Sequence, residues 1–274
     1  MAVSENLKRL IDINAPLWAG EAEIVRTYWT SPVRNREADK LWLKRQCWKE
    51  YAGVGDSIGT TKGMVGDLEV RLRDLVPRLD IDVDRHDLRE LLEKVYVEYT
   101  HYVLFADIYD HLCEKGEPKL NANTLAPWPE EEALASLRRD MRKNLGKIGQ
   151  RASNFTEGGY CTMYSEGAKL QGRPGVDGRI GRACQKVYDD EFGHMMYGVV
   201  GIDEEHLSDR EWADMVDLTC QQLRLRLYMR NAEFSYPVPD SRIKEMIAGK
   251  IEPIAFDYAK AEGYLKAGHA EAAE

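Results

Sequence analysis

The chain has 274 residues, with 47 acidic side chains against 38 basic ones and a formal charge of −9 at pH 7. This balance argues against nucleic acid as a partner and against a basic membrane anchor, because both need clustered Lys and Arg. With 43% hydrophobic and 31% charged residues, the composition is that of a globular protein able to bury a core. The amino terminus lacks the apolar segment of a signal peptide and no apolar run is long enough to span a bilayer, so we expect a cytoplasmic protein with no membrane partner.

Apolar residues recur at three-and-four spacing over long stretches, and the alternation typical of strands is scarce. The sequence therefore predicts an all-α fold in a single domain, residues 1–274. We expect a helical bundle over 38–234, flanked by helical segments at 1–37 and 238–268.

Capping and breaking residues divide this pattern into elements. Pro129, followed by three glutamates, suits a helix start, and Ser208 with Glu211 forms a capping box. Glycines make a break near 53 to 60 plausible, and Pro237 and Pro239 end a helix. In chain order the sequence predicts short helices before 38, then helices over 38–79 (broken as stated), 84–112, 129 to just before 172, 177–200, 209–234 and 241–265.

Five widely scattered cysteines contain no C-x-x-C pair, which argues against a disulfide framework and a zinc site. The chemistry lies instead in two copies of E-x-x-H, at Glu98 and His101 and at Glu191 and His194. Residues three apart share one face of a helix, so each copy presents a carboxylate and an imidazole together.

Each E-x-x-H follows another glutamate by about thirty residues, with a turn between them. Glu69 precedes Glu98, and Glu157 precedes Glu191. Because a helix rises about 1.5 Å per residue, hairpins with nearly equal arms bring each pair to one level. Asp67 is the alternative to Glu69, although Glu69 lies within the apolar stripe of its helix.

These residues resemble the ligand pattern of the ferritin-like di-iron carboxylate superfamily, in which a four-helix bundle supplies two single glutamates and two Glu-x-x-His pairs. The resemblance implies a ferritin-like four-helix bundle with additional flanking helices, and as metal ligands Glu69, Glu98, His101, Glu157, Glu191 and His194. It also implies that Asp190 orients a ligating histidine. The first half departs from the pattern, because Val97 stands where the matching Asp would be.

The physical chemistry is consistent with this interpretation. Four carboxylates neutralise two ferrous ions, and imidazole is an accepted iron ligand. Without metal, converging glutamates would repel one another and lose hydration. The alternative is that the glutamates face solvent and the histidines are ordinary half-buried side chains, but the aromatic and methionine residues around both motifs argue against exposed faces.

The segment after Glu157 contains Gly158 and Gly159, which cost helix stability and clear space beside a metal, or else serve close helix packing. In the bacterial multicomponent hydroxylases that this segment resembles, a threonine stands one turn after the equivalent glutamate. Here Cys161 takes that place and Thr162 follows, so both are candidate pocket residues.

The resemblance implies a non-haem di-iron oxygenase or oxidase that uses dioxygen to oxidise a small organic substrate. Its cofactors would be two iron ions, or manganese with iron, and an external electron donor or reductase would be its partner. We expect a monomer or a homodimer. The alternatives are a ferroxidase or iron-handling protein, a radical-generating di-metal subunit, and a metal-free helical interaction protein.

Overall fold

The computed structural model describes residues 3–53, 63–157 and 162–267, and the regular elements in these ranges are helices, apart from one isolated β-bridge between Leu79 and Val83. The expected all-α class is therefore confirmed. The helices are α1 (Glu5–Tyr28), α2 (Arg36–Trp48), η1 (Lys49–Gly53), α3 (Gly63–Leu75), η3 (Val76–Arg78), α4 (Arg85–Leu112), η4 (Ala122–Thr124), α5 (Pro129–Leu145), α6 (Lys147–Glu157), α7 (Thr162–Ala168), α8 (Gly175–Val200), η5 (Gly201–Glu205), α9 (Asp209–Glu233), α10 (Asp240–Ile247) and α11 (Tyr258–Ala267).

Three helices, α4, α8 and α9, lie where the sequence predicted them, within about two residues at each end. Helix α9 begins with the expected capping box, in which Ser208 accepts from the backbone of Glu211 and Glu211 accepts from the backbone of Ser208. Side-chain capping, by Asp84 at α4 and by Ser208 at α9, therefore explains where two of these helices begin.

The amino-terminal segment differs from the expectation of short helices. Helix α1 is one helix of 24 residues with Pro16 inside it. An internal proline costs about 3 kcal/mol in a helix. Helix α1 packs against α7, α9 and α10 and buries large side chains such as Leu10 and Trp18, so tertiary burial outweighs that cost.

Two predicted helices are interrupted. The one expected from 129 to just before 172 ends at Gly146, whose φ of 54° is left-handed, and continues as the separate helices α6 and α7. The one expected over 241–265 stops before Gly249, with a φ of 74°, and resumes as α11. Glycine adopts such angles without strain, so both glycines end helices that the apolar pattern alone would have continued.

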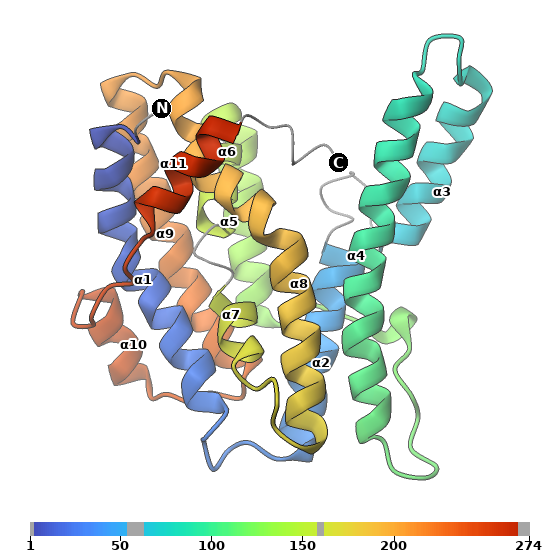
Figure 1. The fold of residues 1–274 in the computed structure, drawn as a ribbon. Helices are drawn as coiled ribbons and strands as arrows, with labels where there is room; N and C mark the ends of the chain where they lie inside the picture. Colours follow the sequence, from blue (N-terminus) through green and yellow to red (C-terminus); the bar gives the residue numbers. More distant parts are fainter. Residues whose placement is uncertain (1–2, 54–62, 158–161, 268–274) are drawn as a thin grey trace.

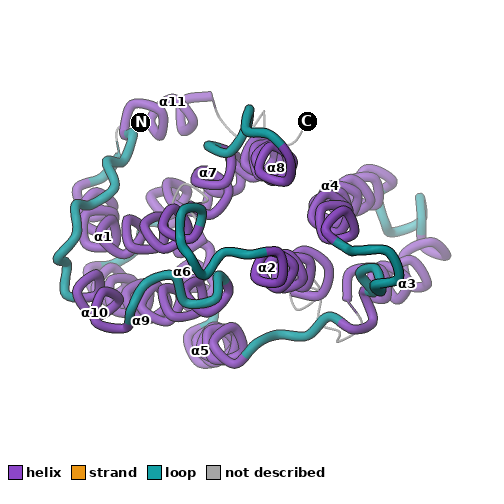
Figure 2. The backbone as a smooth tube through the Cα atoms, turned by 90° about the horizontal axis from the view of Figure 1, so that it is seen from below, coloured by secondary structure: helices purple, strands orange, loops and turns teal. Residues whose placement is uncertain are grey.

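Helices α2, α4, α6 and α8 run through the middle of the molecule, with α1, α9 and α10 on one side and α3 at the opposite edge (Figures 1 and 2). Helix α2 packs on α4, α4 on α8, and α8 on α6 and α7. Helix α5 lies against both α6 and α9. None of the helices traced in the described ranges is both long and apolar enough to cross a membrane.

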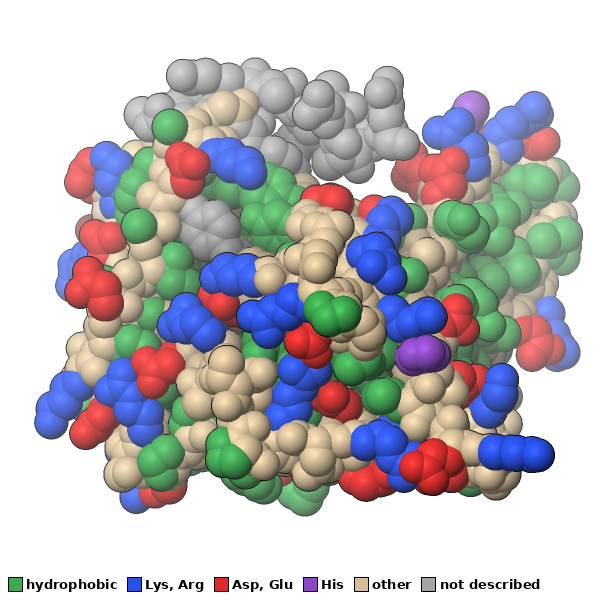
Figure 3. Space-filling model, turned by 60° about the horizontal axis from the view of Figure 1, so that its bottom comes forward, with side chains coloured by type: hydrophobic (Ala, Val, Ile, Leu, Met, Phe, Trp, Pro, Cys, Tyr) green, Lys and Arg blue, Asp and Glu red, His purple; other side chains and the backbone are tan. Residues whose placement is uncertain are grey.

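Helix α3 and the first half of α4 form a hairpin that projects from this body (Figure 1). Hydrophobic side chains gather over it at the right of Figure 3. The large exposed ones include Val65, Val70, Ile81, Leu92 and Tyr96. The hairpin therefore contributes little to the core, which lies among the remaining helices.

Close packing at Gly198 sets the separation of α6 and α8. A Cβ atom at this position would lie 2.8 Å from the backbone oxygen of Asn154 on α6. That distance is below van der Waals contact and the obstacle is backbone, so alanine would force the two helices apart.

We expect Gly198→Ala to lower the free energy of unfolding by about 1 to 3 kcal/mol, although alanine is the better helix former. Urea unfolding followed by circular dichroism measures this. Gly263→Ala on α11 is the matched control, because an added Cβ meets no atom within 4 Å there, and it should leave stability unchanged or raise it. A Gly198→Ala variant as stable as the wild type would show that α6 and α8 are not held by this contact.

Candidate metal centre

Three carboxylates surround one nitrogen of His101, which is fully buried. The Nδ1 atom lies 3.7 Å from Oε2 of Glu50, 3.7 Å from Oε2 of Glu98 and 3.7 Å from Oε1 of Glu191. These distances are too long for hydrogen bonds, and Nδ1 has no hydrogen-bond partner among the described residues. Ligand atoms from Glu50, Glu98 and His101 lie within 4.8 Å of one another, close enough to share one ion.

The other ring nitrogen of His101 is held by Asp190. Its Nε2 lies 3.0 Å from Oδ2 of Asp190, and the second oxygen of Asp190 accepts from Lys186. This contact fixes the ring so that Nδ1 faces the carboxylates. A carboxylate on the far nitrogen is the usual partner of a metal-ligating histidine.

Aromatic packing sets the register that brings these residues together. Trp42 on α2 and Phe105 on α4 lie edge to face, with ring centroids 6.1 Å apart. Glu50 follows Trp42, and Glu98 precedes Phe105, by about two helical turns each. Helix α2 packs on α4, and each carboxylate is about two turns from its member of the aromatic pair. Both carboxylates therefore lie at one level of the bundle.

Glu50 is the residue that sequence reasoning missed. It lies in η1, a π-helical turn at the end of α2, and π-helical turns are frequent at functional sites. Its Oε1 accepts from the hydroxyl of Tyr164 at 2.6 Å and from the amide of Gln46. The available signal was the four-residue spacing of Gln46 and Glu50, which continues the face of α2 that carries Trp42 and Leu43.

The carboxylates and the histidine alter one another's pKa values. Burial lowers the pKa of His101, but the carboxylates of Glu50, Glu98 and Asp190 raise it to about 10. Burial raises the pKa of Glu50, yet His101 and Tyr164 bring it below its ordinary value. Burial and the neighbouring carboxylates raise the pKa of Glu98. In this arrangement a positive charge at the centre stabilises the group.

The second E-x-x-H pair lies beside the first. Oε2 of Glu191 is 3.2 Å from Nδ1 of His194, while its Oε1 faces His101. Hydrogen bonding to Glu191 raises the pKa of His194, although the His194 side chain is 61% exposed. Glu191 therefore has one oxygen directed toward each histidine.

The remaining predicted ligands lie elsewhere. Glu157, at the end of α6, is 60% exposed and accepts from Arg138 at 3.0 Å. Glu69 is 61% exposed and pairs with Arg73 on its own helix, so the structure does not bring it to the cluster. Asp67, its alternative, is buried on α3. Over the described ranges, the group of potential metal ligands contains Glu50 and neither Glu69 nor Asp67.

Of the two candidate pocket residues, Cys161 lies outside the described residues. Thr162 is buried at the start of α7, next to Met163. Met163 lines the cavity described below.

A cavity of about 650 Å³ opens onto this cluster. The candidate ligands that line it are Glu50, Glu98, Glu157, Glu191 and His194, so Glu157 shares a cavity with four of the others. The volume falls in the range of sites for small organic molecules. The apolar side chains that line the cavity include Leu134, Met163, Met195 and Met229.

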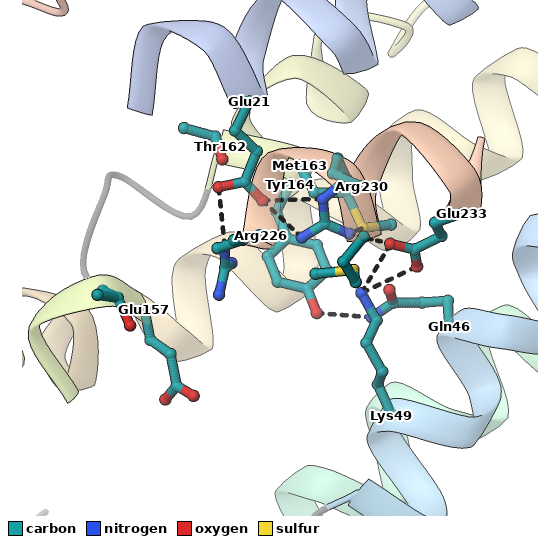
Figure 4. Close-up of polar contacts among 12 residues, drawn as sticks. Glu21, Gln46, Lys49, Glu157, Thr162, Met163, Tyr164, Arg226, Arg230 and Glu233 are labelled. Carbon is teal, nitrogen blue, oxygen red and sulfur yellow. Dashed lines mark hydrogen bonds and ion pairs between the residues drawn. The ribbon is translucent and has the colours of Figure 1, made fainter. Parts of the chain in front are cut away.

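A chain of buried ion pairs forms another part of the wall (Figure 4). Glu21 on α1 accepts from Arg226 at 2.9 Å and pairs with Arg230 at 2.7 Å. Arg230 also pairs with Glu233, which binds Lys49 at 2.9 Å. Breaking such a buried pair leaves an uncompensated charge, so each member fixes the next.

The residues present fit a metal centre. The unpaired Nδ1 of His101 faces carboxylate oxygens, its ring is fixed from behind, and carboxylate with imidazole is a donor set that iron and manganese accept. Comparisons with protein-family models, with curated proteins and with solved structures gave no match. The assignment of a function therefore depends on the geometry of the chain.

Glu21 provides a pH-dependent test of the buried ion pairs. Burial raises the pKa of Glu21, but Arg226 and Arg230 lower it from 4.5 to about 2. A carboxyl whose pKa is lowered in the native state stabilises the fold above its unfolded pKa, and this contribution is lost as the pH falls toward the native value. The stability gap between wild type and Glu21→Gln should therefore shrink by about 1 kcal/mol between pH 7 and pH 3.5.

Urea unfolding at the two pH values measures this gap. Glu69→Gln is the control, because Glu69 forms only an exposed ion pair, and its small gap should change little. A gap for Glu21→Gln that is equal at both pH values would contradict the assignment of Glu21 as an ionised buried partner.

Proposed function

We propose that this chain is a non-haem di-iron protein that uses dioxygen to oxidise a small organic molecule. The observation that supports it most strongly is the Nδ1 atom of His101, buried, without a hydrogen-bond partner and 3.7 Å from each of three carboxylates. A buried nitrogen without a hydrogen bond is costly, whereas a metal ion among these oxygens would use it as a ligand.

In this proposal Glu50, Glu98 and His101 hold one ion, and Glu157, Glu191 and His194 hold the other. Glu50 takes the role that the resemblance gave to Glu69. The four ligand-bearing segments, α2 with η1, α4, α6 and α8, would then correspond to the four helices of a ferritin-like bundle. Four carboxylates would neutralise two divalent ions, with manganese able to replace one iron.

The bound metals would supply the chemistry of dioxygen reduction, and the chain's own residues would position the reactants. Asp190 would orient the His101 ring by its contact with Nε2, which leaves Nδ1 for the metal. Tyr164 would orient Glu50 through a 2.6 Å hydrogen bond. The cavity of about 650 Å³ would bind the organic substrate beside the ligands. The reaction consumes electrons, so the proposal includes an external donor or reductase.

Two alternatives within the same superfamily make different predictions. An iron-handling protein needs no organic pocket, so the volume of the cavity favours the oxygenase. A radical-generating subunit is favoured by one observation, the hydrogen bond between the phenol of Tyr164 and Glu50. An electron paramagnetic resonance signal from a tyrosyl radical, lost in Tyr164→Phe, would support that second candidate.

Metal content tests the proposal. We expect about two metal ions per chain after anaerobic loading with iron and manganese and desalting, measured by plasma mass spectrometry. Glu50→Gln should lose at least one of them, because its Oε2 faces the shared centre. Glu69→Gln is the matched control and should keep both, because its carboxylate pairs with Arg73 at the surface.

Three results would contradict the proposal in different ways. A metal content near zero in the wild type would eliminate the di-metal site. Loss of metal in Glu69→Gln but not in Glu50→Gln would restore the first assignment of the ligands. Iron uptake far beyond two per chain by a large oligomer on gel filtration would indicate iron handling, whereas the oxygenase should be a monomer or a dimer that consumes dioxygen.

A further inference from the structure

Besides Lys94 on α4, five cations line the cavity beside the candidate ligands, and we call these five the basic wall: Lys49, Arg138, Arg142, Arg226 and Arg230. They come from η1, α5 and α9. Arg226 and Arg230 are fixed by Glu21, and Lys49 is fixed by Glu233. These ion pairs are internal to the fold, so the wall keeps its shape when a small molecule enters.

The charges of the wall are nearly balanced, but the balance depends on Glu157. Four carboxylates lie among the five cations: Glu21, Glu131, Glu157 and Glu233. Of these, only Glu157 is also a candidate metal ligand. If Glu157 turns to a metal, Arg138 loses its carboxylate, and five cations then face three anions.

We propose that the basic wall binds the carboxylate of an anionic organic substrate, through Arg138 above all, in the position that the Glu157 carboxylate occupies in this structure. This inference rests on the proposed function, because the metal centre is what draws Glu157 away. Metal binding and carboxylate binding are then coupled, each favouring the other.

Arg138 is prepared for such an exchange. Its side chain is only 14% exposed. Its Nε donates to Gln222 at 3.1 Å and one Nη to Thr156 at 3.0 Å, and these neutral partners hold the guanidinium when Glu157 leaves. In this structure Nη1 of Arg138 donates to an oxygen of the Glu157 carboxylate at 3.0 Å, and it loses this partner when Glu157 leaves. A second carboxylate restores the same charge and geometry, which favours a monoanion over a phosphate dianion.

The substrate would therefore lie next to the metal ligands. Both positions of the Glu157 carboxylate, on Arg138 and on a metal, must be within reach of one glutamate side chain. An acid bound to Arg138 would extend its remaining atoms into the cavity that Glu50, Glu98 and Glu191 line. The substrate class that this geometry selects is a small carboxylic acid.

The first experiment needs no metal. Acetate and benzoate, each compared with its uncharged amide, are titrated by calorimetry into the metal-free chain and into Glu157→Gln. Acetate is small enough that shape cannot exclude it. Because Glu157→Gln removes the anionic partner of Arg138, we expect it to bind both acids about tenfold more tightly than the wild type does, with no change for the amides.

A matched pair of arginine variants tests whether Arg138 is the residue that binds the acid. Glu157→Gln with Arg138→Gln should lose the preference for acid over amide. Glu157→Gln with Arg139→Gln should keep it, because Arg139 is on the same helix but more exposed and pairs with Glu132. Circular dichroism establishes that each variant is folded.

The second experiment tests the coupling. Manganese(II) affinity of the wild type is measured with and without acetate or benzoate, and acid affinity with and without manganese(II). Linkage requires the two factors to be equal, and we expect each to be about tenfold.

The outcomes separate this inference from the proposed function. If two metals bind but acids and amides bind alike in every form, the basic wall is not a substrate site and the metal centre stands. If no metal binds but Glu157→Gln gains affinity for acids through Arg138, the metal centre is wrong and the acid site stands. If Glu157→Gln gains nothing, the acid site is overturned whatever the metal content.

Discussion

The structure depends on placing several carboxylates around one buried imidazole. Glu50, Glu98 and Glu191 arrive from three different helices and face the same nitrogen of His101 at 3.7 Å. Carboxylates this close repel one another, and each loses hydration on burial, so positive charge at their centre stabilises the fold. A protonated His101, with its pKa raised to about 10, supplies that charge in the metal-free chain. Two divalent ions would supply more of it.

The sequence predicted most of the fold and about half of this arrangement. The E-x-x-H pairs were found because helical periodicity and a three-residue spacing are local properties, and the role of Asp190 was expected from the resemblance. Glu50 was missed because its role depends on which helix packs against α4. Equal hairpin arms selected Glu69 on α3, and α3 does precede α4 as a hairpin. Yet α2, further back in the chain, packs against α4 beside His101, and only tertiary structure reveals that choice.

The interruptions in the helices have a similar explanation. Periodicity continues across Gly146 and Gly249, but backbone conformation at each ends the helix. Conversely, the segment before residue 38 was expected to form short helices, but burial of α1 keeps one helix through Pro16. In each case the backbone preference of a single residue competes with the packing around it. The sequence shows the residue but not the packing.

Helices other than the four that carry the candidate ligands change the character of the cavity. Segments η1, α4, α6 and α8 contribute one glutamate each to the cavity, with His194 from α8 and two lysines from η1 and α4, whereas Arg138 comes from α5 and Arg226 and Arg230 come from α9. Helix α1 reaches the same place through Glu21, which holds both arginines of α9. Without these added helices the cavity would keep Lys49 and Lys94 but lose its four arginines, and it would be predominantly acidic. With them it carries opposite charges on adjacent walls, and Glu157 lies on the boundary between them because its carboxylate pairs with Arg138 while its helix packs against α8. If the proposed metal centre draws Glu157 away from Arg138, the position of this one carboxylate determines how much positive charge the cavity offers to a substrate.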